Sequence, residues 1–591
     1  MNRNKTERFE NLPKIDRPRS LFDLSHRHIT TMNDGYLYPI LCKEILPGDT
    51  WSIDTSVVIK MNTPIKPVMD NLYADIYYFA VDNIDLWEHW EQFMGASDDE
   101  WIQATDYRIP KINAPTSYFY EVAKNVTATT SGTYYTESGG VYTAVTLPGA
   151  YVAGTTYYER YSGWKKGTIA DHMGIPTKKS NFTVNALKLR AFAKVYNDWF
   201  RDVNVQKALQ ISKGETTLNG TNGNTYITDV QLGGMPPKVN KFHDLFTSCL
   251  PYPQRLANPV SLPLGTTAPV YPGAAIDTTL ATQGILHWID RTTKTQITGN
   301  HLIGLDQYGN TETTSTTGSW DHVAVPENLN ADLRNATAAT INQFREAMAL
   351  ETLAETWARY GNRYISILNG CFGVTPSNLS LHRSEYLGGK RIPITITPVA
   401  QTSSTDSTSP QGNLAAYSHT NINKGVGAQK SFQQHGYIVG VMCLRTEKSY
   451  QQGLEDEWSR DDKYSFYWNE LANLGEQPIL NKQIYLQGTS QDDEVFGYNE
   501  AWATYRFFNN YVTGEMRSNA ENSLDIYHYA DDYDTLPTLS ADWMAEDEAV
   551  VDRTLAVPST LADQFQVDIY FDIKAARELP MYSVPARLGR I

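Results

Sequence analysis

Residues 72–83 read LYADIYYFAVDN, and residues 565–573, near the other end of the chain, read FQVDIYFDI. Both stretches are short, rich in β-branched and aromatic residues, and alternate in polarity, which is typical of strands half buried in a sheet. In the second stretch every other residue from Phe565 to Ile573 is apolar, so that face is expected to point inward. In the first stretch neither face is fully polar, and we expect it to be covered on both sides.

Two such similar strands lie nearly five hundred residues apart. An internal repeat would explain the likeness, but no period links the two stretches. In a jelly roll, strands pair across great sequence distances, so that early and late strands share a sheet. We therefore predict a mainly β fold, an antiparallel jelly roll with long inserted loops and several helices.

Other segments fit this architecture. WSIDTSVVIKM (51–61) alternates like a strand, and YIVGVMCLR (437–445) reads as a fully buried strand. Apolar spacing predicts a short helix over 85–95, an amphipathic helix over 185–200 and the longest helix over 330–360.

The polarity of the chain suggests where its parts begin and end. Residues 1–30 are predicted to form an extended N-terminal arm, and residues 31–591 a jelly-roll domain with two surface insertions. Residues 113–165 are rich in Thr, Tyr and Gly and predict flat hairpins. Residues 258–326 form the longest irregular stretch, and loops of that length are usually functional or independently folded.

The charge balance restricts the partners. The formal net charge is −16, so the chain as a whole is a poor nucleic-acid binder, and any DNA contact needs a local basic patch or a basic partner. The arm is mildly basic, with seven Arg or Lys against four acids. The aromatic share is 12%, and Tyr and Trp favour sheet surfaces and protein interfaces.

The sequence predicts no cleaved leader, membrane span or disulfide framework. The charged N-terminus does not predict a cleaved leader, and the longest apolar run, around 437–444, is far below the ~18 residues that span a bilayer. The four cysteines are widely spaced singletons, which favours buried thiols over disulfides or a zinc ribbon.

Catalytic signatures are weak. There is no GxSxG or HExxH, and GVGAQKS (425–431) departs from a phosphate loop at Gln429. His26 and His28 share one face of an extended segment, but no neighbouring residues complete a metal-ligand set. We expect no enzyme, cofactor or metal site. One alternative is a secreted-type carbohydrate-binding or glycan-cleaving β protein.

Several long blocks point to one family. They cover roughly two-thirds to three-quarters of the chain and include RSLFDLSHRHITTMNDGYLYPILCKEILPGDTWSID (19–54), GNRYISILNGCFGVTPSNLSLHRSEYLGGKRIPI (361–394), YQQGLEDEWSRDDKYSFYWNELANLGEQPI (450–479) and EVFGYNEAWATYRF (494–507). In these blocks the chain resembles the major capsid proteins of microviruses (Microviridae), the small single-stranded-DNA bacteriophages, and especially the gokushovirus branch. It departs from the family pattern at 113–165 and through 258–326.

The resemblance implies a single eight-stranded antiparallel jelly roll of the viral type, in a structural protein of the virion whose copies assemble in the bacterial cytoplasm. A phage spike or decoration protein is the alternative within phages. It implies a homo-oligomer of sixty copies, a T=1 icosahedral shell around a circular ssDNA genome. The implied partners are a small basic DNA-packaging protein, minor or pilot capsid proteins and a bacterial surface receptor. It also implies a protrusion at the threefold axes that serves host attachment, which we assign to 258–326, with 113–165 as the alternative or a second surface feature.

Confining DNA in an acidic shell requires local positive charge. The basic residues near the chain ends are the candidates for facing the genome, and they are Arg3, Lys5, Arg8, Lys14, Arg17, Arg19, Arg577, Arg587 and Arg590.

Overall fold

A computed structural model gives the fold of the chain. It describes residues 19–96, 107–255, 270–272, 288–290, 301–305, 311–315, 320–326, 329–331, 341–361, 363–400 and 414–582. The chain divides into two compact units. Unit 1 comprises Met1–Pro253 and Ala358–Ile591, and unit 2 comprises Gln254–Trp357.

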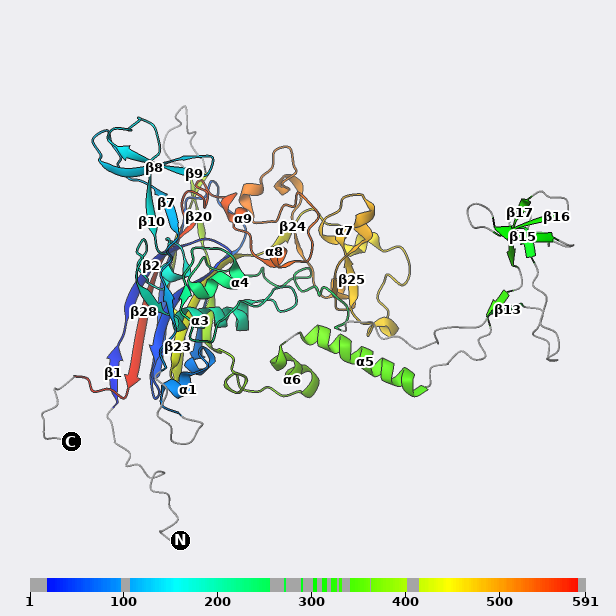
Figure 1. Cartoon of the computed structure of the whole chain (residues 1–591), viewed down its shortest axis with the longest axis horizontal. Helices are drawn as coiled ribbons and strands as arrows, with labels where there is room; N and C mark the ends of the chain where they lie inside the picture. The colour runs from blue at the N-terminus through cyan, green and yellow to red at the C-terminus, as the bar shows by residue number, and fades with distance from the viewer. Residues whose placement is uncertain are drawn as a thin grey trace, which may run out of the picture. The chain divides into compact units, whose positions relative to one another are not determined.

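The first large sheet of unit 1 joins the two ends of the chain. Its strands are β1 (Ser20–Asp23), β2 (His26–Met32), β28 (Phe565–Arg577), β4 (Thr50–Met61) and β22 (Thr420–Ser431). The last strand, β28, pairs with β1 and β2 on one side and with β4 on the other, all antiparallel. Figure 1 shows this red strand beside the blue N-terminal strands. The prediction that early and late strands share a sheet is confirmed.

The second large sheet is also antiparallel, in the order β19–β5–β23–β3. Its strands are β19 (Glu385–Pro393), β5 (Leu72–Asp82), β23 (Gly436–Thr446) and β3 (Leu37–Ile45). Nearly every residue of β23 is buried, as its continuous apolar sequence predicts.

The two sheets enclose one core. Side chains of β28 and β4, such as Phe571 and Val57, share a cluster with Ile76 of β5 and Met442 of β23. This face-to-face arrangement confirms the mainly β jelly-roll fold. Among the described residues the two sheets hold nine strands instead of the predicted eight, because the edge position beside β28 is divided between β1 and β2.

The stretches 72–83 and 565–573 lie in opposite sheets. Alternate residues of β28 are buried, so the inward face predicted for Phe565–Ile573 is confirmed. β5 is buried on both faces, also as predicted. One face joins the core between the sheets, where Tyr78 OH lies 2.6 Å from Thr55 Oγ1 of β4. The other face packs against helix α3 (Leu187–Val195) through residues such as Phe79.

The helix predictions had mixed outcomes. The amphipathic helix over 185–200 is confirmed as α3 followed by a π-helical turn over Tyr196–Phe200. Within 85–95 the structure has only the end of a 3₁₀ turn (Asn83–Asp85) and the four-residue α1 (Trp90–Phe93), and Leu86 and Trp87 between them are buried in the core that includes Phe79 of β5. The longest described helix is α5 (Ile341–Tyr360).

Residues 113–165 contain the predicted hairpins. A sheet in the order β7–β10–β8–β9 is formed by β7 (Tyr118–Val122), β10 (Tyr158–Ser162), β8 (Gly132–Ser138) and β9 (Val141–Leu147). Tyrosines stack across it, with the ring centroids of Tyr120 and Tyr142 3.9 Å apart. Most of its side chains are exposed or half-buried, so stacked rings stabilise it in place of an enclosed core.

The predicted insertion 258–326 falls within unit 2, and most of it lies outside the described residues. The described strands of this unit are β13 (Val270–Pro272), β14 (Trp288–Asp290), β15 (His301–Leu305), β16 (Thr311–Ser315), β17 (Trp320–Pro326) and β18 (Leu329–Ala331). β14 to β17 form one antiparallel sheet, and β13 pairs with β18.

The predicted arm overlaps the first sheet. Residues 1–18 lie outside the described residues, whereas β1 and β2 begin at Ser20 and His26. The part of the predicted arm after residue 19 is thus extended and pairs along the edge of β28, where both strands satisfy their backbone hydrogen bonds. The boundary at residue 30 stays a prediction.

The remaining elements are short and connect the layers. They are β6 (Lys111–Asn113), α2 (Ile169–His172), β11 (Thr183–Asn185), β12 (Leu218–Asn219), α4 (Tyr226–Asp229), α6 (Tyr364–Phe372), β20 (Ile396–Ala400), β21 (Leu414–Ser418), β24 (Ser449–Tyr450), β25 (Gln477–Leu480), α7 (Asn481–Ile484), β26 (Val495–Asn499), β27 (Asn510–Tyr511), α8 (Ala541–Met544) and α9 (Ala549–Asp552).

The burial of β28 makes a stability prediction. Phe571→Ala should destabilise the subunit by about 3–5 kcal/mol, because the side chain is fully buried between the sheets. Tyr570→Ala is the matched control, since the neighbouring ring is 48% exposed and should cost less than about 1 kcal/mol. Urea unfolding of the soluble subunit measures both, and equal midpoints for the two variants would contradict the assigned faces.

Candidate assembly and genome-facing surfaces

The first candidate surface lies where the chain enters and leaves the sheet. Ser20 pairs with Arg577, so the segment before β1 and the segment after β28 attach at the same end of the first sheet. Because the candidate basic residues occupy these two segments, the fold brings their attachment points together although they are far apart in sequence.

Two of the nine candidate residues are described, and both bind this sheet end. Arg19 donates a hydrogen bond to the carbonyl of Gly48 and another to Thr50 Oγ1 at 3.3 Å. Arg577 Nε donates to the buried Asp49 carboxylate at 2.9 Å, and its guanidinium lies 5.2 Å from the ring centroid of Trp51. The charge of Arg577 is therefore balanced within the subunit. The other seven candidates lie outside the described residues.

The outer face of β28 carries cross-strand ion pairs. Arg27 of β2 binds Asp568, and the paired hydrogen bond lowers the pKa of the Asp568 carboxyl. Lys574 Nζ lies 2.6 Å from Asp23 of β1, and this contact lowers the pKa of Asp23. Because these pairs are exposed, they contribute little to stability, but they leave this face without a block of one charge sign.

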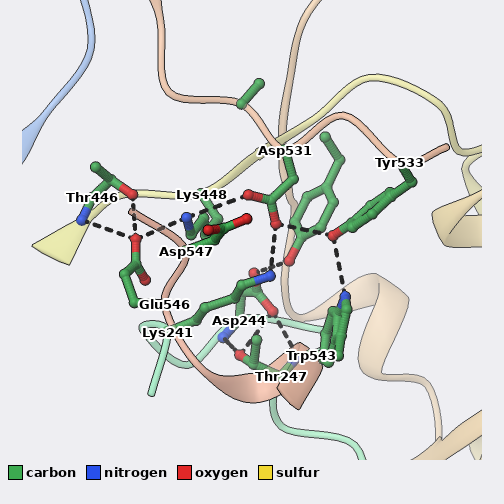
Figure 2. Close-up of polar contacts among 12 residues, drawn as sticks. Lys241, Asp244, Thr247, Thr446, Lys448, Asp531, Tyr533, Trp543, Glu546 and Asp547 are labelled. Carbon is green, nitrogen blue, oxygen red and sulfur yellow. Dashed lines mark hydrogen bonds and ion pairs between the residues drawn. The ribbon is translucent and has the colours of Figure 1, made fainter. Parts of the chain in front are cut away.

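A second polar feature is fully buried. Figure 2 shows Lys448, just after β23, between Asp531 and Glu546, with Lys448 Nζ 3.3 Å from Asp531 and 2.8 Å from Glu546. Lys241 Nζ lies 2.7 Å from the second oxygen of Asp531. Glu546 also accepts hydrogen bonds from the backbone and hydroxyl of Thr446, at the end of β23. We call Lys241, Lys448, Asp531 and Glu546 the buried charge network.

The network is internally balanced. Burial favours the neutral form of Asp531, but Lys448 and Lys241 outweigh it and hold its pKa below the usual range. Burial likewise opposes the charge of Lys448, yet Asp531 and Glu546 raise its pKa. Burial and then Glu546 raise the pKa of the adjacent Asp34, which favours a neutral carboxyl there. Two cations thus face two anions, and they join β23 to loops nearly a hundred residues later.

The third feature is an exposed aromatic surface in the loops after β24. We define residues 455–511 as the aromatic segment. Its own Ile479 and Phe496 pack together with Phe246 in a small separate core. Its outward side chains include Trp458, which is 78% exposed, and Phe508, which is 83% exposed. Clusters of exposed apolar side chains on this scale mark interaction surfaces.

A cavity of about 730 Å³ lies over the outer face of the second sheet. Its walls include Tyr77, Phe242 and Tyr386, with Arg391 and Arg445 held against Asp75. Both guanidinium groups stack on Phe242, at 4.1 and 4.2 Å from its centroid. These arginines are thus bound within the subunit, and the lining presents no nucleophile next to a general base.

The remaining sequence candidates have structural roles. His28 Nδ1 lies 3.0 Å from the carbonyl oxygen of Ile40, and burial lowers the pKa of His28. GVGAQKS (425–431) lies within strand β22 and makes no phosphate loop. The part of the chain that the structure describes holds no cluster of three His, Cys, Asp or Glu that could bind a metal, and none of its helices could span a bilayer. All four cysteines are free thiols.

Comparison with known proteins agrees with this geometry. The model of the family described as "Capsid protein (F protein)" matches residues 11–134 and 159–587. The chain belongs to this phage capsid family. Its residues are 37% identical over 572 positions to capsid protein VP1 of Spiroplasma virus 4, with 96% of this chain and 95% of the relative covered.

Two further relatives extend the match. Capsid protein VP1 of Bdellovibrio phage phiMH2K is 36% identical over 586 positions, covering 98% of each chain. Capsid protein VP1 of Chlamydia phage 1 is 32% identical over 631 positions, covering 98% of this chain and 97% of the relative. The resemblance to microvirus capsid proteins of the gokushovirus type is thereby confirmed along the whole chain.

The protein is a structural capsid protein of the virion, and its family builds multi-copy shells. The alternatives of a carbohydrate-active β protein and of a spike or decoration protein give way to this assignment. The family match omits residues 135–158, which hold most of the β8–β9 hairpin.

Sequence reasoning missed the buried charge network. Lys448, Asp531 and Glu546 look like ordinary surface charges in an acidic chain, and no spacing signals that they meet. The aromatic segment had a signal, because the run DDKYSFYWNE (461–470) places aromatic residues among charges without a helical or strand period.

Removing the central cation tests the network. Lys448→Met should destabilise the subunit by about 3–5 kcal/mol, because it leaves Asp531 and Glu546 buried with less compensating charge. The matched control is Lys482→Met, whose partner Asp493 is 77% exposed, and which should cost about 0–1 kcal/mol. Guanidinium unfolding followed by tryptophan fluorescence measures both free energies, and a stability change below 1 kcal/mol in Lys448→Met would contradict the anchoring role.

Proposed function

We propose that sixty copies of this capsid protein form a T=1 icosahedral shell around a circular ssDNA genome. Assembly takes place in the host cytoplasm, and the basic residues of the two terminal segments face the DNA. A small basic packaging protein and minor or pilot proteins complete the particle. The inserted segments contribute to attachment at a bacterial surface receptor.

The observation that carries the DNA-facing part is the antiparallel pairing of Ser20 with Arg577. It joins the terminal segments, with Arg3, Lys5, Arg8, Lys14 and Arg17 before it and Arg587 and Arg590 after it, to one end of the sheet. An acidic subunit with a net charge of −16 repels DNA over most of its surface. In this proposal, two basic terminal segments that attach at one sheet end supply the local positive charge that packaged phosphates require.

Arg577 has a different place in this proposal from the other candidates. Its guanidinium is bound to buried Asp49 and stacked on Trp51, so it supports the sheet end at which the terminal segments attach. Arg19 supports the same end through Gly48 and Thr50. We therefore assign these two arginines to positioning, and the more distal basic residues to the DNA itself.

Host attachment requires surface features that vary between related phages. Residues 258–326 fall within a separate compact unit, which supports the assignment of a protrusion to this insertion. The hairpin sheet at 113–165 is the second candidate, because the family match omits residues 135–158 and the sheet exposes Tyr118 and Val141.

Neutralising the terminal cations tests the genome-facing role. A phage carrying Arg3→Gln, Lys5→Gln, Arg8→Gln, Lys14→Gln and Arg17→Gln should form shells of normal size with packaged DNA reduced at least about twofold, because fewer phosphates are neutralised. Electron microscopy gives the shell, and the ratio of nucleic acid to protein gives the genome content. The control Lys124→Gln with Lys207→Gln removes exposed charges elsewhere and should leave the ratio unchanged. Unchanged genome content in the five-residue variant would refute the assignment.

Deleting the insertion tests attachment. Replacing residues 258–326 with a short Gly-Ser linker should leave particle yield similar and lower adsorption to host cells at least about tenfold, since a surface insertion carries the receptor contact. A parallel variant lacking 135–158 separates the two candidates. If that variant alone loses adsorption, the hairpin sheet is the attachment feature, and if deletion of 258–326 yields no folded subunit, that segment is structural.

A further inference from the structure

The aromatic segment exposes an unusual number of large apolar side chains. Its exposed members are Trp458, Tyr464, Phe466, Tyr467, Trp468, Leu474, Leu486, Val495, Tyr505, Phe507, Phe508 and Tyr511. Half-exposed aromatic residues are common one at a time, but a dozen apolar side chains in fewer than sixty residues are not. Leaving this surface in water costs free energy, which a partner that covers it recovers.

The surface is already ordered in the single chain. The Arg460 guanidinium pairs with Asp456 at 3.0 Å and stacks over the ring of Tyr505 at 4.4 Å. Tyr467 packs edge-on against Trp502 at 5.6 Å. Such preorganisation lowers the entropic cost of docking a partner.

The indole nitrogens of the segment have partners inside the subunit. Trp468 Nε1 donates to the carbonyl of Lys463 at 2.6 Å, and Trp502 Nε1 donates to Leu471 at 2.8 Å. The polar atoms of these two rings are therefore satisfied from within. What Trp468 presents outward is ring surface, which suits a protein partner with apolar groups.

The charge of the aromatic segment restricts the kind of partner that can bind it. Residues 455–511 hold eleven Asp or Glu against four Lys or Arg, and the exposed acids include Glu457, Asp461 and Glu470. This excess repels DNA and anionic lipid surfaces alike. The partner must carry positive charge beside its apolar groups.

Another part of the same subunit has the opposite charge. Residues 151–200 hold eight Lys or Arg against three Asp or Glu, of which Arg190 is buried and Lys178 and Lys194 are paired with acids of the same subunit. Lys166, Lys179 and Lys188 are exposed there. A second copy of this chain therefore offers the complementary charge that the aromatic segment lacks.

We propose that the aromatic segment of one copy docks on a neighbouring copy where the exposed lysines Lys166, Lys179 and Lys188 meet its acids. The inference rests on the proposed shell and names the contact that holds it together. Because the two surfaces differ, the contact is heterologous, and repeating it around a symmetry axis closes a ring of subunits. Aromatic side chains provide most of the binding energy, and the charges set orientation and exclude wrong partners.

A charge exchange in the complete phage tests the pairing. The acid-reversal variant carries Glu457→Lys, Asp461→Lys and Glu470→Lys, and the lysine-reversal variant carries Lys166→Glu, Lys179→Glu and Lys188→Glu. Each should lower particle yield at least about tenfold, because like charges then face each other across the contact. The chain that carries both sets should recover most of the yield, since opposite charges face each other again.

The aromatic contribution is tested separately. Trp458→Ser with Phe508→Ser should give a folded subunit and few particles, whereas Phe372→Ser, which removes a 70% exposed ring from α6, should assemble like the parent. Hydroxyl-radical labelling of the parent gives a readout that needs no variant. Labelling of residues 458–468 and 505–511 should fall at least about fivefold between dissociated subunits and particles.

The outcomes separate the docking contact from the shell. Normal yield in both reversal variants, or equal labelling before and after assembly, would overturn the contact while leaving the shell intact. Loss in both reversal variants without recovery in the combined chain would show that another macromolecule covers the aromatic segment. A parent chain that forms no closed particles would overturn the proposed shell and the contact together.

Discussion

The position of β28 is the constraint on which the rest of the structure depends. This last strand lies between β1 and β2 on one side and β4 on the other, so the first sheet is incomplete until the end of the chain has folded onto its beginning. The core between the sheets needs the same strand, because Phe565, Val567 and Phe571 are fully buried in it. Such long-range pairing makes folding slow and cooperative, and it gives the subunit a rigid frame.

That frame allows the connecting segments to serve other purposes. The loops around residues 531 and 546 bind the end of β23 through the buried charge network, in which each lysine is matched by a carboxylate. A balanced network of this kind fixes one arrangement of loops more than it adds stability. With the loop layer fixed, the aromatic segment can hold many apolar side chains outward without collapsing onto the core.

The distribution of charge also distinguishes the general surface of the subunit from the surfaces proposed to make contacts. A net charge of −16 makes free subunits repel one another, while in our proposals the basic residues near the chain ends and within 151–200 make specific contacts. Pairing of Ser20 with Arg577 brings the attachment points of the two terminal segments together, and this sheet end is stabilised by Arg19 and by the Arg577–Asp49 pair. A capsid subunit thus combines overall repulsion with a few attractive surfaces, which favours ordered assembly over aggregation.

The sequence by itself determined the strands, their buried faces and the family, because period-two alternation in FQVDIYFDI and the continuous apolar run of β23 depend only on neighbouring residues. It also indicated that early and late strands share a sheet. Only the tertiary structure decided that β5 and β28 lie in opposite sheets, and that the edge beside β28 is divided into two strands. Only the tertiary structure, too, decided that Lys448 forms ion pairs with Asp531 and Glu546, and that Arg577 forms an ion pair with Asp49. These features arise from contacts between residues distant in sequence, and local patterns carry no information on which distant groups will meet.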